Sequence, residues 1–207
     1  MKYMRLKILS KRAMLTVALF SGSVLFAAIL LPHTPKNLIH DGSASLIENA
    51  AILSNEEPAS VELPARLKIP TIDVDSAVIP MGLTSDGAMD VPKSPTEVAW
   101  FDLGLRPGEN GAAVIAGHYG WKNNTPGVFD NLYKLAVGDK IFVEDEKGST
   151  AAFVVREVKI YGKDEAVPDA FVSSDGKAHL NLVTCAGAWD KAEKTRFERL
   201  IVFTDKE

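Results

Sequence analysis

The chain of 207 residues is long enough for one membrane-spanning segment and one domain of ordinary size. Its hydrophobic content of 46% and charged content of 24% are typical of a globular protein and exclude a disordered chain. The formal net charge of −4 divides into +5 over residues 1–12 and −9 over the remainder; because nucleic-acid binding needs a basic surface, no nucleic-acid partner is expected.

The N-terminal segment combines a basic flank with a long apolar run. Residues 1–12 carry five basic side chains and no acids, and residues 13–32 (AMLTVALFSGSVLFAAILLP) carry no charge. About 20 mostly apolar residues span the hydrocarbon core as a helix. A cleaved signal peptide is the alternative, but its apolar region is shorter and ends in a small-x-small site, whereas this run ends in ILLP. We therefore predict an uncleaved membrane anchor, with residues 1–12 in the cytoplasm and the later residues outside.

The next segment, residues 33–63, mixes small polar, acidic and isolated apolar residues without sustained periodicity. This pattern predicts an extracellular linker between the anchor and the domain that follows. Its two histidines, His33 and His40, are interpreted as solvated residues, because two histidines alone are a weak metal signal.

Residues 64–207 are predicted to form a mainly β domain. Short β-rich runs recur between Gly, Pro, Asp and Asn residues: RLKIPTI, SAVIP, AAVIAGH, KIFVED, AAFVVREVKIY, HLNLVTC and RLIVFT. Such spacing is typical of an antiparallel sandwich or barrel, and a closed barrel would leave no exposed sheet edge. Only residues 128–135 suggest a helical turn. No phosphate-binding loop, HExxH motif or EF-hand pattern occurs, so neither a cofactor nor a metal is predicted.

The only cysteine, Cys185, lies where the run HLNLVTC passes into a loop that contains glycine. A single thiol excludes an intramolecular disulfide and a multi-cysteine metal site, which leaves a small buried side chain or a catalytic nucleophile. A nucleophile needs a base, and two histidines lie in the folded part. His179 is on the same strand at roughly 20 Å, beyond reach, and is interpreted as a strand-surface residue. His118 ends a different strand, so its side chain could meet the thiol where two strand ends share one rim.

Acyl transfer also needs a positive or hydrogen-bonding group where the oxyanion develops. Arg199 opens the terminal run RLIVFT, and the short connection from Cys185 would let that strand return antiparallel beside HLNLVTC. We therefore expect Arg199 near Cys185. Arg196, three residues earlier, is the competing candidate, and an exposed salt bridge is the structural alternative for either arginine.

Together, AVIAGH with His118, LVTC with Cys185 and the strand-opening Arg199 resemble the sortase family of membrane-anchored cysteine transpeptidases. The resemblance covers the chain from about Leu63. The cysteine motif usually reads TLxTC in this family, whereas this chain reads NLVTC, with Asn181 at the first position. The stretch from GLTSDG to AVIAGH looks most like housekeeping-type class F and E sortases.

The resemblance implies an eight-stranded β-barrel with short helices. It implies Cys185 as nucleophile, His118 as general acid/base, and Arg199 as the group that positions the substrate carbonyl and stabilises the oxyanion. The implied substrates are an LPxTG-like sorting signal, cleaved after Thr through a thioacyl-enzyme, and an amine such as a peptidoglycan precursor.

Other classes fit the sequence less well. Papain-like and NlpC/P60-type peptidases place the cysteine before the histidine, whereas here His118 precedes Cys185 by 67 residues, and the SHGC-like motif of L,D-transpeptidases is absent. A calcium site is known in some relatives of the family. Here the only support for one is a set of scattered acids, Asp164, Glu165 and Asp169, which are interpreted as a solvated loop. The non-enzymatic alternative is a membrane-tethered β-barrel that binds wall polymer or peptide and merely buries Cys185.

Overall fold

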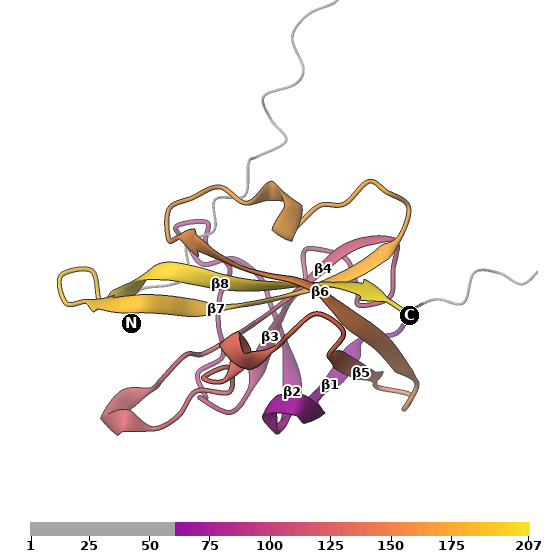
Figure 1. The fold of residues 1–207 in the computed structure, drawn as a ribbon, viewed down its shortest axis with the longest axis horizontal. Helices are drawn as coiled ribbons and strands as arrows, with labels where there is room; N and C mark the ends of the chain where they lie inside the picture. Colours follow the sequence, from indigo (N-terminus) through magenta and orange to yellow (C-terminus); the bar gives the residue numbers. More distant parts are fainter. Residues whose placement is uncertain (1–60) are drawn as a thin grey trace, which may run out of the picture. The chain divides into compact units, whose positions relative to one another are not determined.

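Eight β-strands close into a barrel in the part of the chain that the computed structural model describes, residues 61–207 (Figure 1). The strands are β1 (Pro64–Ile69), β2 (Val74–Met81), β3 (Val98–Phe101), β4 (Gly111–Gly117), β5 (Lys140–Asp145), β6 (Thr150–Gly162), β7 (Ala178–Asp190) and β8 (Thr195–Lys206). The 3-10 helices are η2 (Pro70–Ile72), η3 (Lys122–Asn124), η4 (Leu132–Lys134) and η5 (Pro168–Ala170). The predicted basic flank, anchor and most of the linker lie outside the described residues. Within residues 61–207, no helix has the length and apolar character needed to cross a membrane.

The strands follow the order β1-β2-β3-β4-β7-β8-β6-β5, and β5 pairs with β1 to complete the barrel. The pairs β2–β3 and β4–β7 are parallel, and the other neighbours are antiparallel. Closure pairs every strand on both sides, which confirms the predicted closed β-barrel. The parallel pair β4–β7 matters most for function, because it places the ends of two distant sequence segments on one rim.

Alternate residues of β7 serve two different apolar clusters. Leu180 and Leu182 point into the barrel, where they pack with residues such as Ile115 from β4. Val183 points outward and belongs to a second cluster that includes Ile201 of β8. Because strand side chains alternate between faces, Cys185 shares the outward face of Val183. The thiol therefore belongs to the outer surface of the barrel and not to its interior.

The connection between β6 and β7, residues 163–177, covers part of this outward face (Figure 1). Val167 and Ala170 pack against the outer cluster, and the Asn181 amide donates a hydrogen bond of 2.8 Å to the carbonyl oxygen of Ala170. Asn181 thus helps to hold this connection on the sheet.

The surface position predicted for His179 is wrong. The side chain is buried, with Nδ1 2.8 Å from the Asp205 carboxylate and Nε2 3.0 Å from that of Asp175. Asp175 comes from the connection that covers the outward face, so the strand pattern alone did not reveal this burial. His179 is a structural residue that ties the connection to β7 and β8.

Two local features complete the comparison with the sequence. The helical turn expected within residues 128–135 is present as η4, with Leu132 and Leu135 buried. The strand β3 was not among the predicted runs, although its four residues are all buried. It pairs in parallel with β2 and antiparallel with β4, so it provides the link that closes the barrel on the His118 side.

Candidate active site

Two adjacent parallel strands bring His118 and Cys185 to the same rim. Ala116 of β4 pairs with Val183 of β7, and His118 and Cys185 each follow two residues later. Between them, the Thr184 hydroxyl donates a hydrogen bond of 2.8 Å to the carbonyl oxygen of Gly117. This bond ties the two strand ends together where the functional side chains leave the sheet.

The loop after β4 fixes the backbone and the ring of His118. The amide of Phe129 donates to the His118 carbonyl oxygen at 3.0 Å. Gly127 packs so closely that an added Cβ would lie 2.3 Å from that oxygen, so only glycine fits there. The His118 ring places Nε2 2.7 Å from the Pro92 carbonyl oxygen and packs edge-on against Trp121, with ring centroids 4.6 Å apart. The imidazole is thus held at the rim, while the thiol lies on the neighbouring strand.

Cys185 is half-buried and pairs directly with Arg199 across the antiparallel β7–β8 ladder. This register confirms the expected return of the terminal strand beside the cysteine strand. Burial raises the pKa of the Cys185 thiol, and the positive charges of Arg199 and, to a smaller extent, Arg196 oppose that rise. The net effect favours the neutral thiol in the resting protein.

The two arginines occupy different positions. Arg199 is only 2% exposed, and its guanidinium donates to the carbonyl oxygens of Arg196 and Glu198 and to the hydroxyl of Thr195. Its Nε is buried without a hydrogen-bond partner in the described region. Such an orphaned donor is costly and calls for a functional or structural reason.

Arg196 lies nearer the surface. Its guanidinium donates to the Gly187 carbonyl oxygen at 2.6 Å and lies 4.5 Å from the centre of the Tyr119 ring. Arg196 lines the cavity beside Cys185, whereas Arg199 does not line it and donates a hydrogen bond to Thr195, which does. The strand register and the larger effect on the pKa of the thiol favour Arg199 as the arginine that acts on Cys185. The position of Arg196 in the cavity lining favours Arg196.

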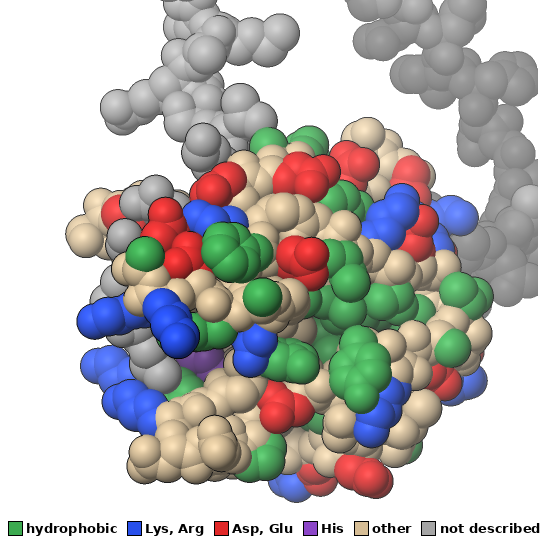
Figure 2. All heavy atoms as spheres, turned by 60° about the vertical axis from the view of Figure 1, so that its left-hand side comes forward, with side chains coloured by type: hydrophobic (Ala, Val, Ile, Leu, Met, Phe, Trp, Pro, Cys, Tyr) green, Lys and Arg blue, Asp and Glu red, His purple; other side chains and the backbone are tan. Residues whose placement is uncertain are grey.

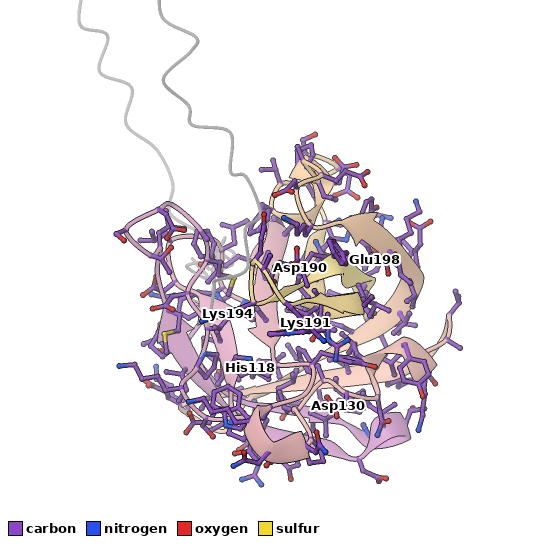
Figure 3. All side chains as sticks on the ribbon, turned by 90° about the vertical axis from the view of Figure 1, so that its left-hand side faces the viewer. His118, Asp130, Asp190, Lys191, Lys194 and Glu198 are labelled. Atoms are coloured by element: carbon purple, nitrogen blue, oxygen red, sulfur yellow. The ribbon has the colours of Figure 1, made fainter. Side chains whose placement is uncertain are left out.

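A cavity of about 920 Å³ contains both candidate reacting groups, His118 and Cys185. Its walls come from the β2–β3 connection, the loop after β4 and the β7–β8 hairpin. Figure 3 shows the hairpin residues Lys191 and Lys194 on the same side of the molecule as His118. The lining residues are Asp90, Val91, Pro92, Lys93, Gly117, His118, Tyr119, Gly120, Trp121, Lys122, Cys185, Trp189, Lys194, Thr195 and Arg196.

Three aromatic residues of this cavity were not among the predicted site residues: Tyr119, Trp121 and Trp189. The two tryptophans lie in the loops that directly follow His118 and Cys185, and this proximity in sequence was the available signal. A loop tryptophan could equally cap the barrel, so only the fold decides. Trp121 also packs against the His118 ring, which makes it a wall of the cavity and a support for the imidazole.

Among residues 61–207, no group of three or more His, Cys, Asp or Glu side chains is placed to hold a metal ion. Of the scattered acids, Asp164 pairs with Lys163, and the Glu165 carboxylate accepts a hydrogen bond from the Gly162 amide.

Alkylation of the resting thiol is expected to be slow at neutral pH and to accelerate as pH rises. Only the thiolate reacts, and burial raises the pKa of Cys185, so its formation requires a higher pH than for a free cysteine. The rate of iodoacetamide incorporation, followed by intact mass from about pH 6 to 10, measures this midpoint. Arg199→Ala should move it further upward, because that change removes the larger opposing charge. A midpoint at or below that of free cysteine would contradict this reading of the site.

The fold and the cavity define a class of protein: a closed β-barrel that carries one thiol and one imidazole at the adjoining ends of two parallel strands. A family model described as Sortase domain matches residues 67–207, more than half of the chain. The chain therefore belongs to the sortase family, whose members are cysteine transpeptidases.

Solved structures agree on the fold. Sortase C-1 from Streptococcus pneumoniae has a TM-score of 0.53 and 27% identity, over 69% of this chain and 66% of that one. Sortase C-1 from Actinomyces oris has a TM-score of 0.54 and 24% identity, over 69% and 72%. Sortase A from Corynebacterium diphtheriae has a TM-score of 0.54 and 22% identity, over 70% and 60%. This chain thus spans between 60% and 72% of the length of these relatives, and the similarities under 25% identity establish the fold alone.

No curated protein matches the chain. The class F or E assignment remains a prediction.

Proposed function

We propose that this protein is a membrane-anchored transpeptidase that cleaves an LPxTG-like sorting signal between Thr and Gly and transfers the acyl part to a cell-wall amine. The single observation that carries the proposal is the presence of Cys185 and His118 in one cavity at the ends of adjacent strands. A merely structural cysteine would need neither the cavity nor the imidazole.

In the proposed reaction, His118 takes the proton of the Cys185 thiol as Sγ attacks the Thr carbonyl carbon. The C–N bond to Gly breaks, the leaving amine receives the proton, and a thioester remains on Cys185. An incoming amine then reverses these roles and releases the thiol. The need for a proton acceptor during attack fits the raised pKa of the resting thiol, because little thiolate is present beforehand.

Intact-mass measurement tests this proposal. The domain from residue 61, mixed with an LPxTG-type peptide, should gain the mass of the fragment that ends in Thr, and an amine should discharge that adduct. If a panel of sorting peptides gave neither adduct nor product while Cys185 resisted alkylation in the folded state across the pH range, the non-catalytic β-barrel that binds wall polymer or peptide would replace the enzyme.

Replacing Arg199 by alanine is expected to lower kcat/KM by on the order of 10²–10³, the usual cost of losing an oxyanion donor. Its position opposite Cys185 and its unpartnered Nε support this role. The same assay with Arg196→Ala is the matched comparison, and thermal melting of both variants separates unfolding from lost chemistry. Near-normal turnover in folded Arg199→Ala, combined with a collapse in Arg196→Ala, would transfer the role to Arg196.

We also propose that residues 13–32 anchor the protein in a bacterial cell membrane, with residues 1–12 in the cytoplasm and the domain outside. The basic flank and the uncharged apolar run support this orientation. Protease added to intact protoplasts should remove the domain. Protection of the domain would contradict the orientation, and a mature form that lacks residues 1–32 would contradict the anchor.

A further inference from the structure

The cavity beside Cys185 is rich in positive charge, although the protein as a whole is acidic. Four of its lining residues carry basic side chains, and Asp90 is the only acidic residue of the lining. The cations are Lys93, Lys122, Lys194 and Arg196. In Figure 2, Lys and Arg side chains lie beside a recess in which a histidine is visible.

These four cations form no salt bridge within residues 61–207, whereas several lysines elsewhere in that region do. Five lysines elsewhere form salt bridges: Lys68, Lys140, Lys147, Lys159 and Lys163. Within residues 61–207, none of the four cavity cations does so. Lys122 and Arg196 lie instead over the aromatic rings of Trp121 and Tyr119, at 5.7 and 4.5 Å from the ring centres. Positive charge without a salt-bridge partner thus lines the cavity around the candidate nucleophile.

The neighbouring acids lie outside the cavity lining and contact other groups. The Asp190 carboxylate accepts hydrogen bonds from the amides of Ala192 and Glu193 within the hairpin turn, and Glu193 itself pairs with Lys163. The Asp130 carboxylate accepts from the amides of Gly120 and Gly127 in the loop after β4. None of these acids lines the cavity.

The outward face has a different character on the opposite side of the thiol. There the strand residues Val183, Ala116 and Ile201 form an apolar surface under residues 163–177. This surface is already buried under residues 163–177, with Ala116, Val183 and Ile201 at most 1% exposed, so it offers no open groove to a second molecule. An amine that attacks a thioester on Cys185 must therefore approach through the cationic cavity, which contains that thiol.

We propose that this cavity selects an acceptor amine that carries anionic groups, either carboxylates or phosphates. The inference rests on the proposed transpeptidase function. Four surrounding cations disfavour a protonated amine and so favour the neutral form, which alone can attack. Anionic groups beside that amine are attracted by the same cations. In the step itself, the amine nitrogen bonds to the thioester carbonyl, the C–S bond breaks, and the amine proton passes through His118 to the Cys185 sulfur.

A set of peptides with the same nucleophile tests the inference. Gly-Asp-Asp-amide, Gly-Asn-Asn-amide and Gly-Lys-Lys-amide share an N-terminal glycine and differ in charge, and Gly-phosphoserine-amide distinguishes phosphate from carboxylate. The acyl-enzyme is first formed with one sorting peptide and verified by mass. Transfer against hydrolysis is then measured for each amine, corrected for its fraction of neutral amine.

We expect the acidic peptides to be transferred about tenfold more efficiently than the basic one, since each exposed pair contributes only a small factor. The difference should shrink at high salt, where charges are screened beyond a few Å. The double change Lys122→Glu with Lys194→Glu should remove or reverse the preference. Lys134→Glu with Lys206→Glu alters net charge equally outside the cavity and should keep it.

The two proposals fail in different ways. An acyl-enzyme that all the amines discharge equally, with no effect of salt, would overturn the anionic acceptor and leave the transpeptidase intact. Failure to form any acyl-enzyme would overturn the transpeptidase and this inference with it. Because the wild-type amine series stands by itself, poor folding of a charge-reversed variant would not rescue the inference.

Discussion

Cys185→Ala is expected to abolish both cleavage of a sorting peptide and transfer to an amine, to below the detection limit of the assay. The alanine side chain cannot form the thioester on which both steps depend. None of the other lining residues can replace it, since the described region contains no second thiol. The measurement is peptide turnover by mass spectrometry, together with intact mass to confirm that no adduct forms.

The same variant should remain folded. The thiol is half-buried at the cavity and lies in a regular stretch of β7, so alanine removes one heavy atom without disturbing the β7–β8 ladder. Its loss costs about 0.8 kcal/mol, as for one buried methylene. A melting temperature close to that of the wild type is therefore the control. Residual turnover in pure, folded Cys185→Ala would show that Cys185 is not the nucleophile.

Several features were predictable because they depend on local pattern. Alternation along β7 assigned Cys185 and His179 to one face, and the short connection to β8 placed Arg199 beside the cysteine. Both inferences need only strand geometry and a tight return. The mainly β domain followed in the same way from many short strands, whereas the closed eight-stranded barrel was implied by the resemblance to the sortase family.

Other features depend on distant segments and left little mark in the sequence. The burial of His179 results from Asp175 and the connection that covers β7, while the strand pattern itself indicated an exposed position. The strand β3 is four residues long and buried throughout, so it shows no alternation. Arg196 lines the cavity, whereas Arg199 is buried beside it. This difference likewise depends on where the β7–β8 hairpin packs.

The pairing of Cys185 with His118 lies between these two cases. The sequence suggested that two strand ends share a rim, but adjacency required the parallel register of β4 with β7. Among residues 61–207, no hydrogen bond joins His118 to the thiol, and Nε2 of His118 lies 2.7 Å from the Pro92 carbonyl oxygen. A catalytic role for the imidazole therefore requires a ring nitrogen of His118 to come within hydrogen-bonding reach of the thiol when substrate arrives, which makes His118 the most informative residue to change.

His118→Ala is expected to reduce kcat by a factor of about 10²–10⁴, the range for loss of a general acid–base. The thiol should still be alkylated at high pH, because its reactivity there depends on its own ionisation and not on proton transfer to a base. Turnover should nevertheless fail, since no group takes the thiol proton during attack or returns a proton to the leaving amine. Added imidazole should restore part of the activity through the space left in the cavity.

His179→Ala provides the matched histidine control. His179 is buried between the carboxylates of Asp175 and Asp205, outside the Cys185 cavity, so its loss should lower the free energy of unfolding by about 1–3 kcal/mol. Its kcat per folded molecule should stay near wild type. A folded His118→Ala protein with normal kcat, or a loss of kcat in His179→Ala as large as that in His118→Ala, would show that the imidazole beside Cys185 does not carry the proton.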